Sequence, residues 1–330
     1  MDRELVESSY TPAALQALKS FPVDAENVEL IAHSENVTFR VAVRGADTDY
    51  VLRLHRPGYN TIEQLKSERV WTQALKDAGM SVPDSLLTRR GEYFVPIDIP
   101  GVATQCYAGM TTWIEGSTLN DYLETHSDRE ERARYFRRIG ELAAAIHNQS
   151  TNWETPPGFA RPRLDLDGLL GEAPRWGRFW EHADLTAAEQ KLLRRARKRI
   201  HATLSDYGER PDNFSLIHAD LHPDNIVYDG ESLALIDFDD SGYGWHMYEI
   251  ASALIEYRFA PGFGALRDAL LEGYREHRPL AAQDADMLPA FLLIRGMAIM
   301  GWFHQRPEHA GSDYFKEVKN WVIGECDSNE

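Results

Sequence analysis

Two short polar clusters, each coupled to an apolar run, constrain the fold of this chain more than any other feature. The first is His218-Ala-Asp-Leu-His-Pro-Asp-Asn225, which follows the run Ser215–Ile217. The second is Ile236-Asp-Phe-Asp-Asp240, which ends the run Leu233–Ile236. Short apolar runs of this kind predict buried strands. The chain therefore has to place two strands so that each ends in an acidic loop, with a rigid support behind the carboxylates.

The N-terminal part has the pattern of a small sheet with one helix. Strand-like runs separated by polar or Gly-containing turns predict strands at residues 28–33, 37–43, 50–55, 93–99 and 103–113. Between the third and fourth of these runs, residues 61–78 carry an apolar stripe at helical spacing. One acid, Glu68, lies within that stripe.

After Gly116 the apolar residues recur mainly at helical spacing. The pattern predicts helices at 119–124, 129–148, 187–206 and from about 248 onward, with strands at 214–218, 226–228 and 233–238. We therefore predict an α+β protein with two lobes. Residues 1–112 form a small β-rich lobe, 113–117 a connector, and 118–330 a larger helical lobe that carries the polar loops, with the active site expected between the lobes.

Composition and charge exclude several classes of protein. The chain has 330 residues and a net charge of −17, which argues against a nucleic-acid binder. Two cysteines far apart, Cys106 and Cys326, fit a reducing compartment, and the polar N-terminus does not resemble a signal peptide. The most apolar run, Met287–Phe303, is interrupted by Arg295 and predicts a buried helix. We therefore expect a cytoplasmic enzyme with neither a nucleic-acid nor a membrane partner.

The two polar clusters suit phosphoryl transfer from a nucleoside triphosphate. That reaction requires a metal ion that bridges the phosphates, a carboxylate at the acceptor hydroxyl and a cation on the phosphates. Asn225 and Asp237 supply oxygen ligands of the kind that Mg²⁺ binds. Asp220, five residues before Asn225, is the candidate for the carboxylate that faces the acceptor hydroxyl.

The string His-x-Asp-x-His-Pro-x-Asn, followed by Ile-Asp-Phe-Asp, resembles the aminoglycoside phosphotransferase and choline kinase superfamily, which includes type II homoserine kinases and stress-response kinase A. The resemblance implies a two-lobed protein-kinase-like fold, ATP as the phosphoryl donor and Mg²⁺ as the cofactor. Asp220 matches the catalytic aspartate of the superfamily, and Asn225 and Asp237 match its metal ligands. The β-rich lobe is then the nucleotide-binding lobe.

The resemblance also implies roles for residues outside the two clusters. Arg53 stands where kinases have a phosphate-binding lysine, and Glu68 is its predicted ion-pair partner because a lone buried carboxylate is costly. Ser34 begins the stretch that matches the phosphate-covering hairpin, which here lacks glycine. Glu115 lies in the connector, whose backbone receives the adenine in the family. Glu249 stands where a helix aspartate usually supports the catalytic loop.

The acceptor is the part of the reaction that the sequence constrains least. Asp240, Tyr243 and His222 are candidate substrate contacts. The cationic acceptors of the superfamily and the acidity of this chain favour a small amine-bearing alcohol, such as an aminoglycoside, choline or homoserine.

Three alternatives remain open at the level of sequence. The first is a Ser/Thr protein kinase of the stress-response kinase A type. The second is a non-catalytic ATP-binding module. The third is a metallohydrolase whose ligands come from the alternating His218, Asp220, His222 and Asp224.

Overall fold

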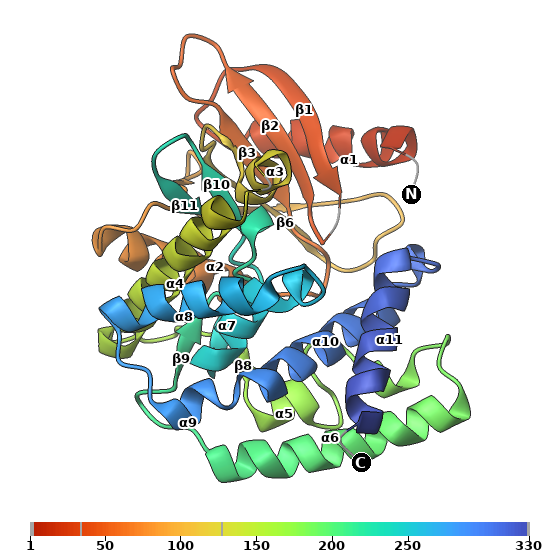
Figure 1. The fold of residues 1–330 in the computed structure, drawn as a ribbon. Coiled ribbons are helices and arrows are strands. Elements are labelled where there is room, and N and C mark those ends of the chain that lie inside the picture. Colours follow the sequence, from red (N-terminus) through yellow and green to blue (C-terminus); the bar gives the residue numbers. More distant parts are fainter. Residues whose placement is uncertain (1–2, 34, 127, 329–330) are drawn as a thin grey trace. The chain divides into compact units, whose positions relative to one another are not determined.

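The computed structural model describes residues 3–33, 35–126 and 128–328 and divides into two compact units (Figure 1). The first unit contains the chain up to Thr118 together with Thr155–Ala160 and Ile226–Asp239. The second contains Leu119–Glu154, Arg161–Asn225 and the chain from Asp240 onward. The first unit therefore takes in two later segments that the predicted boundaries assign to the helical lobe.

An antiparallel sheet is the frame of the first unit. Its strands are β1 (Ala25–His33), β2 (Val37–Val43), β3 (Tyr50–Leu54), β4 (Ser85–Leu86), β5 (Phe94–Ile97) and β6 (Cys106–Thr112). They pair in the order β1-β2-β3-β6-β4, and β5 also pairs with β6. All five predicted strands are confirmed, and β4 is an addition to them. Since side chains alternate along a strand, Leu52 and Leu54 point into the core, and the side chain of Arg53 lies on the opposite face of β3.

The core face of this sheet is covered by a helix that the sequence pattern did not predict, α1 (Arg3–Leu18). Its core contacts include Ala13, Ala14 and Ala17. Three alanines give a weak apolar period, and Pro12 interrupts the helical pattern. The contribution of α1 to the core therefore depends on tertiary packing, which local periodicity does not register.

The predicted helix over residues 61–78 is confirmed as α2 (Ile62–Asp77). Its first turn is closed by a capping box between Thr61 and Gln64. Glu68 lies within the buried face of α2 at 1% exposure, as its place in the apolar stripe predicts.

A second, small sheet of the first unit holds the connector next to the second polar cluster. It consists of β7 (Ser117–Thr118), β10 (Ile226–Tyr228) and β11 (Leu233–Leu235). Gly116, just before β7, has a φ of 134°, and a Cβ there would lie 2.4 Å from the carbonyl oxygen of Tyr228. Only glycine permits this close approach of two backbones.

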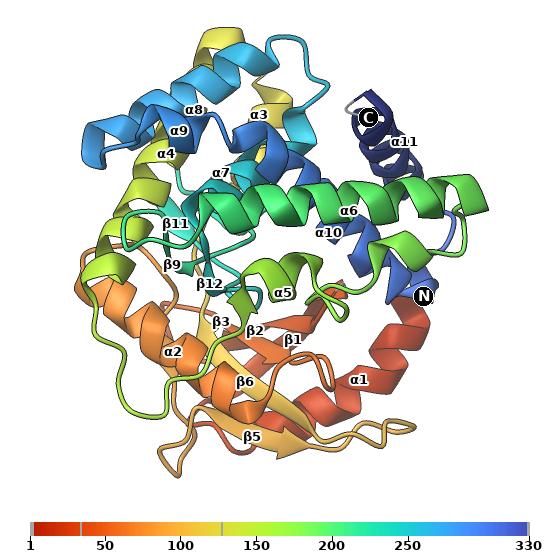
Figure 2. The same cartoon turned by 90° about the horizontal axis from the view of Figure 1, so that it is seen from below.

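The second unit is mainly helical, as predicted. Its helices are α3 (Leu119–Thr125), α4 (Arg129–Asn152), α5 (Leu166–Leu170), α6 (Ala187–Tyr207), α7 (His246–Leu254), α8 (Phe263–His277), α9 (Ala282–Ala285), α10 (Leu288–His304) and α11 (Asp313–Ser328). Helix α4 packs against α8, and α6 runs beside α5 and α11 (Figure 2).

A three-stranded sheet within this unit carries the first polar cluster. Strand β9 (Phe214–Ile217) pairs with β12 (Gly242–Trp245), which also pairs with β8 (Arg163–Leu164). The sequence pattern predicted β9 but not β12, because two of its four residues are glycine. Those glycines are required by packing: a Cβ on Gly242 would lie 2.5 Å from the carbonyl oxygen of Pro162.

The apolar run that the sequence marks as a buried helix belongs to α10. Among the described residues, Ala282–His304 is the stretch with the length and hydropathy of a membrane span, and 56% of its most apolar window is buried inside the protein. Phe291, Ile294, Met297 and Met300 of α10 are each at most 1% exposed. This burial is that of a core helix.

Helices α4 and α8 cross at two glycines, Gly140 and Gly273, and this close approach leads to a prediction about stability. A Cβ on Gly140 would lie 2.0 Å from the carbonyl oxygen of Leu270, a backbone atom that cannot move independently. We expect Gly140→Ala to lower the free energy of unfolding by about 1–3 kcal/mol, measured by urea denaturation. Gly324→Ala is the matched control, because Gly324 in α11 has nothing within 4 Å of the added methyl group. It should stabilise the protein by up to about 1 kcal/mol. Equal stability of the two variants would contradict this account of the crossing.

Candidate active site

The first polar cluster forms a loop whose backbone is held by a buried glutamate. Strand β9 ends at Ile217, and the N–H groups of His218 and Ala219 donate to the two carboxylate oxygens of Glu249 at 2.8 and 2.6 Å. Ala219 has a φ of 67°, in the left-handed region that alanine rarely adopts. Glu249, on α7, is 0% exposed, and burial raises its pKa to about 8. The predicted support of this loop by Glu249 is therefore present in the structure.

Asp220 lies at the centre of this loop and is surrounded by donors. The amide Nδ2 of Asn225 lies 2.9 Å from both the backbone oxygen and Oδ2 of Asp220. The ring of His222 approaches the same Oδ2 at 3.3 Å. The other oxygen, Oδ1, accepts from the guanidinium of Arg295 on α10. The loop therefore presents a carboxylate whose orientation is fixed from three directions.

These neighbours keep Asp220 ionised. Burial by itself would raise the pKa of Asp220, but the charges of His222 and Arg295 lower it well below its usual range. A carboxylate with such a low pKa is a weak general base at neutral pH. It suits a reaction in which the acceptor hydroxyl must be oriented and its proton accepted late, as in phosphoryl transfer.

Asn225 is turned so that its oxygen is available to a ligand. Every contact of its side chain within the described residues uses Nδ2, including one of 3.1 Å to the ring of His222. Its Oδ1 makes no hydrogen bond among the described residues. Asn225 ends the short helix η2 (Pro223–Asn225) and directly precedes β10.

In the first unit, Arg53 is bound by the acids of the second polar cluster. Its Nη1 lies 3.1 Å from Asp237 and 3.4 Å from Asp239. The predicted direct ion pair between Arg53 and Glu68 is wrong. The carboxylate of Glu68 lies 3.7 Å from Arg69, and it affects the pKa of Arg53 less than Asp237 and Asp239 do. Burial opposes the charge of Arg53, but these acids raise its pKa above the usual value. Asp237 and Asp239, which follow β11, are therefore the acids closest to the guanidinium of Arg53.

Asp239 connects Arg53 to the hairpin between β1 and β2. Its carboxylate accepts from Nδ2 of Asn36, and its backbone oxygen accepts from Nδ2 of Asn60 at 3.1 Å. Nδ1 of His55 is 3.7 Å away. Asn36 also accepts from the N–H of Arg56 at 3.0 Å. The glycine-free hairpin is thus held by side-chain hydrogen bonds from residues that the sequence analysis did not single out.

Asp237 is the more accessible of the two acids that contact Arg53. Its side chain is 41% exposed, against 7% for Asp239. Its φ of 62° lies in the left-handed region, and among the described non-glycine residues only Ala219 shares this feature. Strained backbone of this kind is concentrated at functional loops. Here it occurs once in each of the two predicted loops.

Of the predicted nucleotide contacts Glu115 and Ser34, the structure describes only Glu115. Glu115 is in the connector with its side chain 76% exposed, and Nη2 of Arg40 approaches it at 3.3 Å. The guanidinium of Arg40 also stacks over the ring of Trp113, 4.4 Å from its centroid. Ser34 lies outside the described residues.

The predicted acceptor contacts Asp240 and Tyr243 belong to the second unit. Oδ1 of Asp240 accepts from the indole N–H of Trp176 at 3.2 Å. Tyr243 lies in β12, where its N–H donates to the carbonyl oxygen of Pro162 at 2.9 Å. Trp176 stacks on Tyr248, with ring centroids 5.8 Å apart, so Asp240 stands beside an aromatic pair.

The metallohydrolase arrangement is not assembled. Within the described part of the chain, His222, Asp224 and Glu256 have ligand atoms within 4.8 Å of one another, but His218 and Asp220 do not join this group. The carboxylate of Asp220 instead accepts from Arg295, and this guanidinium would compete with a metal ion for the carboxylate. His218 is fully buried, and its Nδ1 accepts from the N–H of Asp220 at 3.3 Å.

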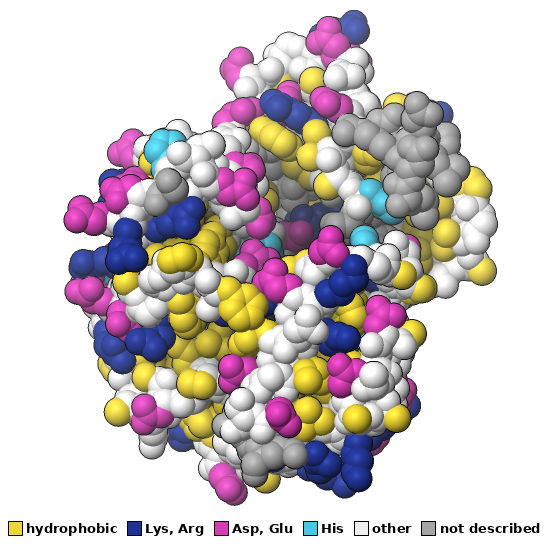
Figure 3. All heavy atoms as spheres, turned by 45° about the vertical axis from the view of Figure 1, so that its right-hand side comes forward, with side chains coloured by type: hydrophobic (Ala, Val, Ile, Leu, Met, Phe, Trp, Pro, Cys, Tyr) yellow, Lys and Arg dark blue, Asp and Glu magenta, His cyan; other side chains and the backbone are white. Residues whose placement is uncertain are grey.

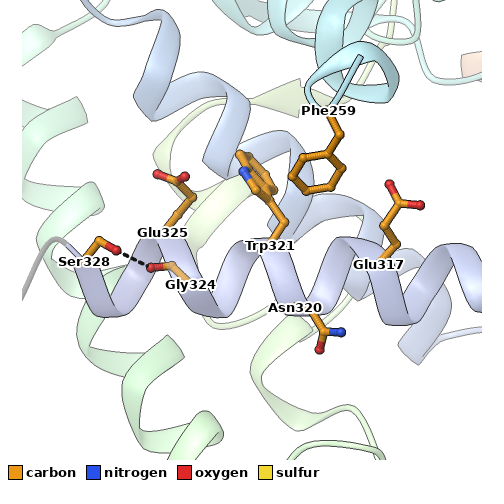
Figure 4. A pocket seen from close by; sticks show the side chains of 7 residues that line it. All are labelled: Phe259, Glu317, Asn320, Trp321, Gly324, Glu325 and Ser328. Carbon is orange, nitrogen blue, oxygen red and sulfur yellow. Dashed lines mark hydrogen bonds between the residues drawn. The ribbon is translucent and has the colours of Figure 1, made fainter. Parts of the chain in front are cut away.

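The surface adds two observations. On the face drawn in Figure 3, acidic and basic side chains are interspersed rather than gathered into separate patches. An open depression of about 510 Å³ lies along α11, lined by Phe259, Trp321 and the acids Glu317 and Glu325 among others (Figure 4). It includes none of the predicted site residues and offers no counter-charge for a phosphate.

Comparison with known proteins decides the family. The sequence model described as the phosphotransferase enzyme family, APH, matches residues 28–283. The chain belongs to this phosphotransferase family. The family predicted from the two polar clusters is therefore confirmed.

Individual relatives agree with this assignment. The homoserine kinase of Sinorhizobium fredii (strain NBRC 101917 / NGR234) is 27% identical over 297 residues, which cover 88% of this phosphotransferase and 79% of the relative. A microcompartment-associated aminopropanol kinase has a TM-score of 0.81 and 30% identity, covering 96% of this chain and 95% of that one. An amicoumacin kinase, solved with AMP-PNP, Ca²⁺ and its ligand, has a TM-score of 0.79 at 19% identity, covering 98% and 96%.

The predicted kinase-like α+β fold and enzyme class are thereby confirmed. The protein is a kinase of the APH phosphotransferase family.

Sequence reasoning missed the residue that contacts Asp220 most directly from another element. Arg295 interrupts an otherwise apolar run, and that lone charge was the available signal. In the sequence this charge argues against a membrane span but does not by itself indicate a functional residue. Asp239 belongs to the second polar cluster, but its contact with Arg53 joins positions 186 residues apart in the chain, which no local pattern marks.

The support of the Asp220 loop by Glu249 leads to a second prediction. Glu249→Gln places an amide nitrogen against one of two buried N–H donors, so one donor loses its acceptor. We expect the free energy of unfolding to fall by about 1–3 kcal/mol, measured by urea denaturation, together with a loss of turnover. Glu325→Gln, an exposed glutamate on α11, is the matched control and should leave stability within about 0.5 kcal/mol of wild type. Wild-type stability and turnover of Glu249→Gln would show that the loop does not need this carboxylate.

Proposed function

We propose that this enzyme transfers the γ-phosphoryl group of ATP to the hydroxyl of a small amine-bearing alcohol, with Mg²⁺ as its metal. A bond forms between the acceptor oxygen and the γ-phosphorus, and the bond from that phosphorus to the β-phosphate oxygen breaks. ADP leaves, and the hydroxyl proton passes to Asp220. The observation that carries the proposal is the carboxylate of Asp220, oriented by Asn225 and Arg295 on a loop held by Glu249.

The donor set of the two loops fits a hard divalent cation. Asp237 offers a carboxylate that is 41% exposed, and Asn225 offers a carboxamide oxygen that makes no described protein contact. One carboxylate and one amide oxygen, completed by phosphates and water, match the preference of Mg²⁺. A cation bound by these side chains would neutralise charge on the phosphates.

Arg53 is the proposed phosphate-binding cation. Its guanidinium is 16% exposed and is held by Asp237 and Asp239 on one side of β3. Arginine keeps its charge at any physiological pH and presents several donors in a plane, so it can replace the lysine of the kinase pattern. Glu68 adds negative charge near Arg53 and is proposed to help keep it in place.

The proposed acceptor class follows from charge and from the relatives. Asp240 provides a carboxylate beside the aromatic pair of Trp176 and Tyr248, which suits an ammonium group. The names of the relatives specify aminopropanol and homoserine, and each of these compounds combines an amine with a hydroxyl. We propose that His222 and Tyr243 border the same acceptor.

The alternatives from the sequence gain no support. The named relatives act on small molecules, so a protein Ser or Thr acceptor is not proposed. Membership of a phosphotransferase family weighs against a non-catalytic module and against a hydrolase. The cytoplasmic location stays a prediction from the sequence.

The proposal is tested by ADP release in a screen of amino alcohols, aminoglycosides and generic protein substrates. With an acceptor that the wild type uses, Asp220→Asn should lower kcat at least about 100-fold, because it removes the proton acceptor. Asp237→Asn should raise the Mg²⁺ concentration needed for half-maximal rate and lower the maximal rate. Circular dichroism checks that both variants fold.

Asp206→Asn is the control for these substitutions. Asp206 is an exposed acid on α6, and its variant should keep the wild-type rate and Mg²⁺ dependence. Turnover of protein substrates alone would overturn the small-molecule acceptor. A wild-type rate in Asp220→Asn would remove the assignment of that residue.

A further inference from the structure

Arg295 is a charged side chain in the middle of the most apolar helix of the second unit. Its side chain is only 11% exposed, and its neighbours Ile294 and Met297 are almost fully buried. The guanidinium carbon lies 5.9 Å from the ring centroids of both Trp176 and Tyr248. Moving a cation out of water is costly unless an anion compensates it. This position therefore calls for an anionic partner.

The contacts of Arg295 within the described residues use only part of its hydrogen-bonding capacity. Nη1 donates to the hydroxyl of Tyr248 at 3.3 Å, and Nη2 donates to Oδ1 of Asp220. Nε is buried and has no hydrogen-bond partner there. A guanidinium has five N–H donors, so one on Nη1 and one on Nη2 remain for a ligand besides the buried Nε–H. Oxyanions such as carboxylates are the groups that arginine binds with several donors at once.

The position of Arg295 also restricts the charge of the acceptor. The guanidinium is bonded to the carboxylate that must face the acceptor hydroxyl, so any substrate group next to that hydroxyl lies near a positive charge. A purely cationic acceptor would leave the remaining donors of Arg295 without an acceptor. Asp240 supplies negative charge on the same aromatic pair, through its bond to Trp176. The two charges are complementary to a molecule that carries both an anion and a cation close to its hydroxyl.

We infer that Arg295 binds a carboxylate of the acceptor, and that the acceptor is a short amino acid with a hydroxyl in its side chain. Its hydroxyl faces Asp220, its carboxylate faces Arg295 and its ammonium group faces Asp240. This inference rests on the proposed function and specifies its acceptor; the bonds made and broken are those given above. It separates two compounds that the relatives' names suggest, because homoserine carries a carboxylate and aminopropanol does not.

Matched pairs of acceptors test this inference. The pairs are L-homoserine with propanolamine, L-threonine with isopropanolamine, and L-serine with ethanolamine, in which the second member is the first without its carboxylate. The readout is the ratio of kcat/KM within each pair, measured by ADP release with the full chain, Mg²⁺ and saturating ATP. We expect the carboxylate-bearing member of at least one pair to be preferred about 10- to 100-fold, the size of a charge-assisted hydrogen bond.

Variants of Arg295 separate recognition from a purely structural role. Arg295→Gln should lower the preferred pair's ratio at least about 10-fold, mainly through KM of the carboxylate-bearing member. Arg295→Lys keeps the charge but loses the planar guanidinium, so its kcat/KM ratio should fall between those of the wild type and Arg295→Gln. It also replaces the Gln variant if that variant fails to fold. The control is Asp220→Asn, which breaks the same ion pair but should lower kcat of both members equally and preserve the ratio.

Each outcome bears on one of the two claims. If Arg295→Gln lowers both members of a pair by the same factor, Arg295 is only a counter-ion of Asp220 and the inference is wrong. A wild-type preference for the members without a carboxylate also overturns it, as does turnover confined to choline or aminoglycosides. In those cases the proposed function stands. Absence of turnover with every hydroxyl acceptor would instead contradict the proposed function.

Discussion

The carboxylates of the two polar clusters are paired with arginines that are largely withdrawn from water. In the second unit, Arg295 binds the carboxylate of Asp220, and in the first, Arg53 binds Asp237 and Asp239. Burial raises the pKa of a carboxylate and a neighbouring cation lowers it, so these partners favour the charged form that phosphoryl transfer requires. Arginine serves this purpose better than lysine, because it stays charged when desolvated and reaches two oxygens at once.

This pairing changes the meaning of the chain's net charge of −17. Residues 210–260 contain ten acids and two arginines, a net charge of −8 that surrounds the two loops. In the structure that charge is partly compensated by side chains from distant positions in the chain, Arg53 and Arg295, and by the ring of His222. The negative charge that is not compensated suits a divalent cation and an ammonium group. The acidity is therefore a local property of the site as well as a property of the surface.

Much of the architecture was predictable because it is encoded locally. Strand alternation gave five strands of the first sheet, and the buried stripe of α2 followed from a 3.6-residue period. Helix α1 was missed because three of its core contacts are alanines and Pro12 interrupts its pattern. Strand β12 was missed because two of its four residues are glycine. The partners of Arg53 and the role of Arg295 were missed for a related reason. Their contacts join residues 184 and 75 positions apart in the chain, and only the fold brings them together.

The central claim is that the oriented Asp220 directs a phosphoryl group to an acceptor hydroxyl rather than to water. Phosphorus-31 NMR of the enzyme with ATP, Mg²⁺ and a hydroxyl-bearing amino acid or amino alcohol tests this claim most directly. We predict a new phosphomonoester resonance that appears with ADP and only when the acceptor is present. Formation of ADP and inorganic phosphate at the same rate with and without any acceptor would contradict the account.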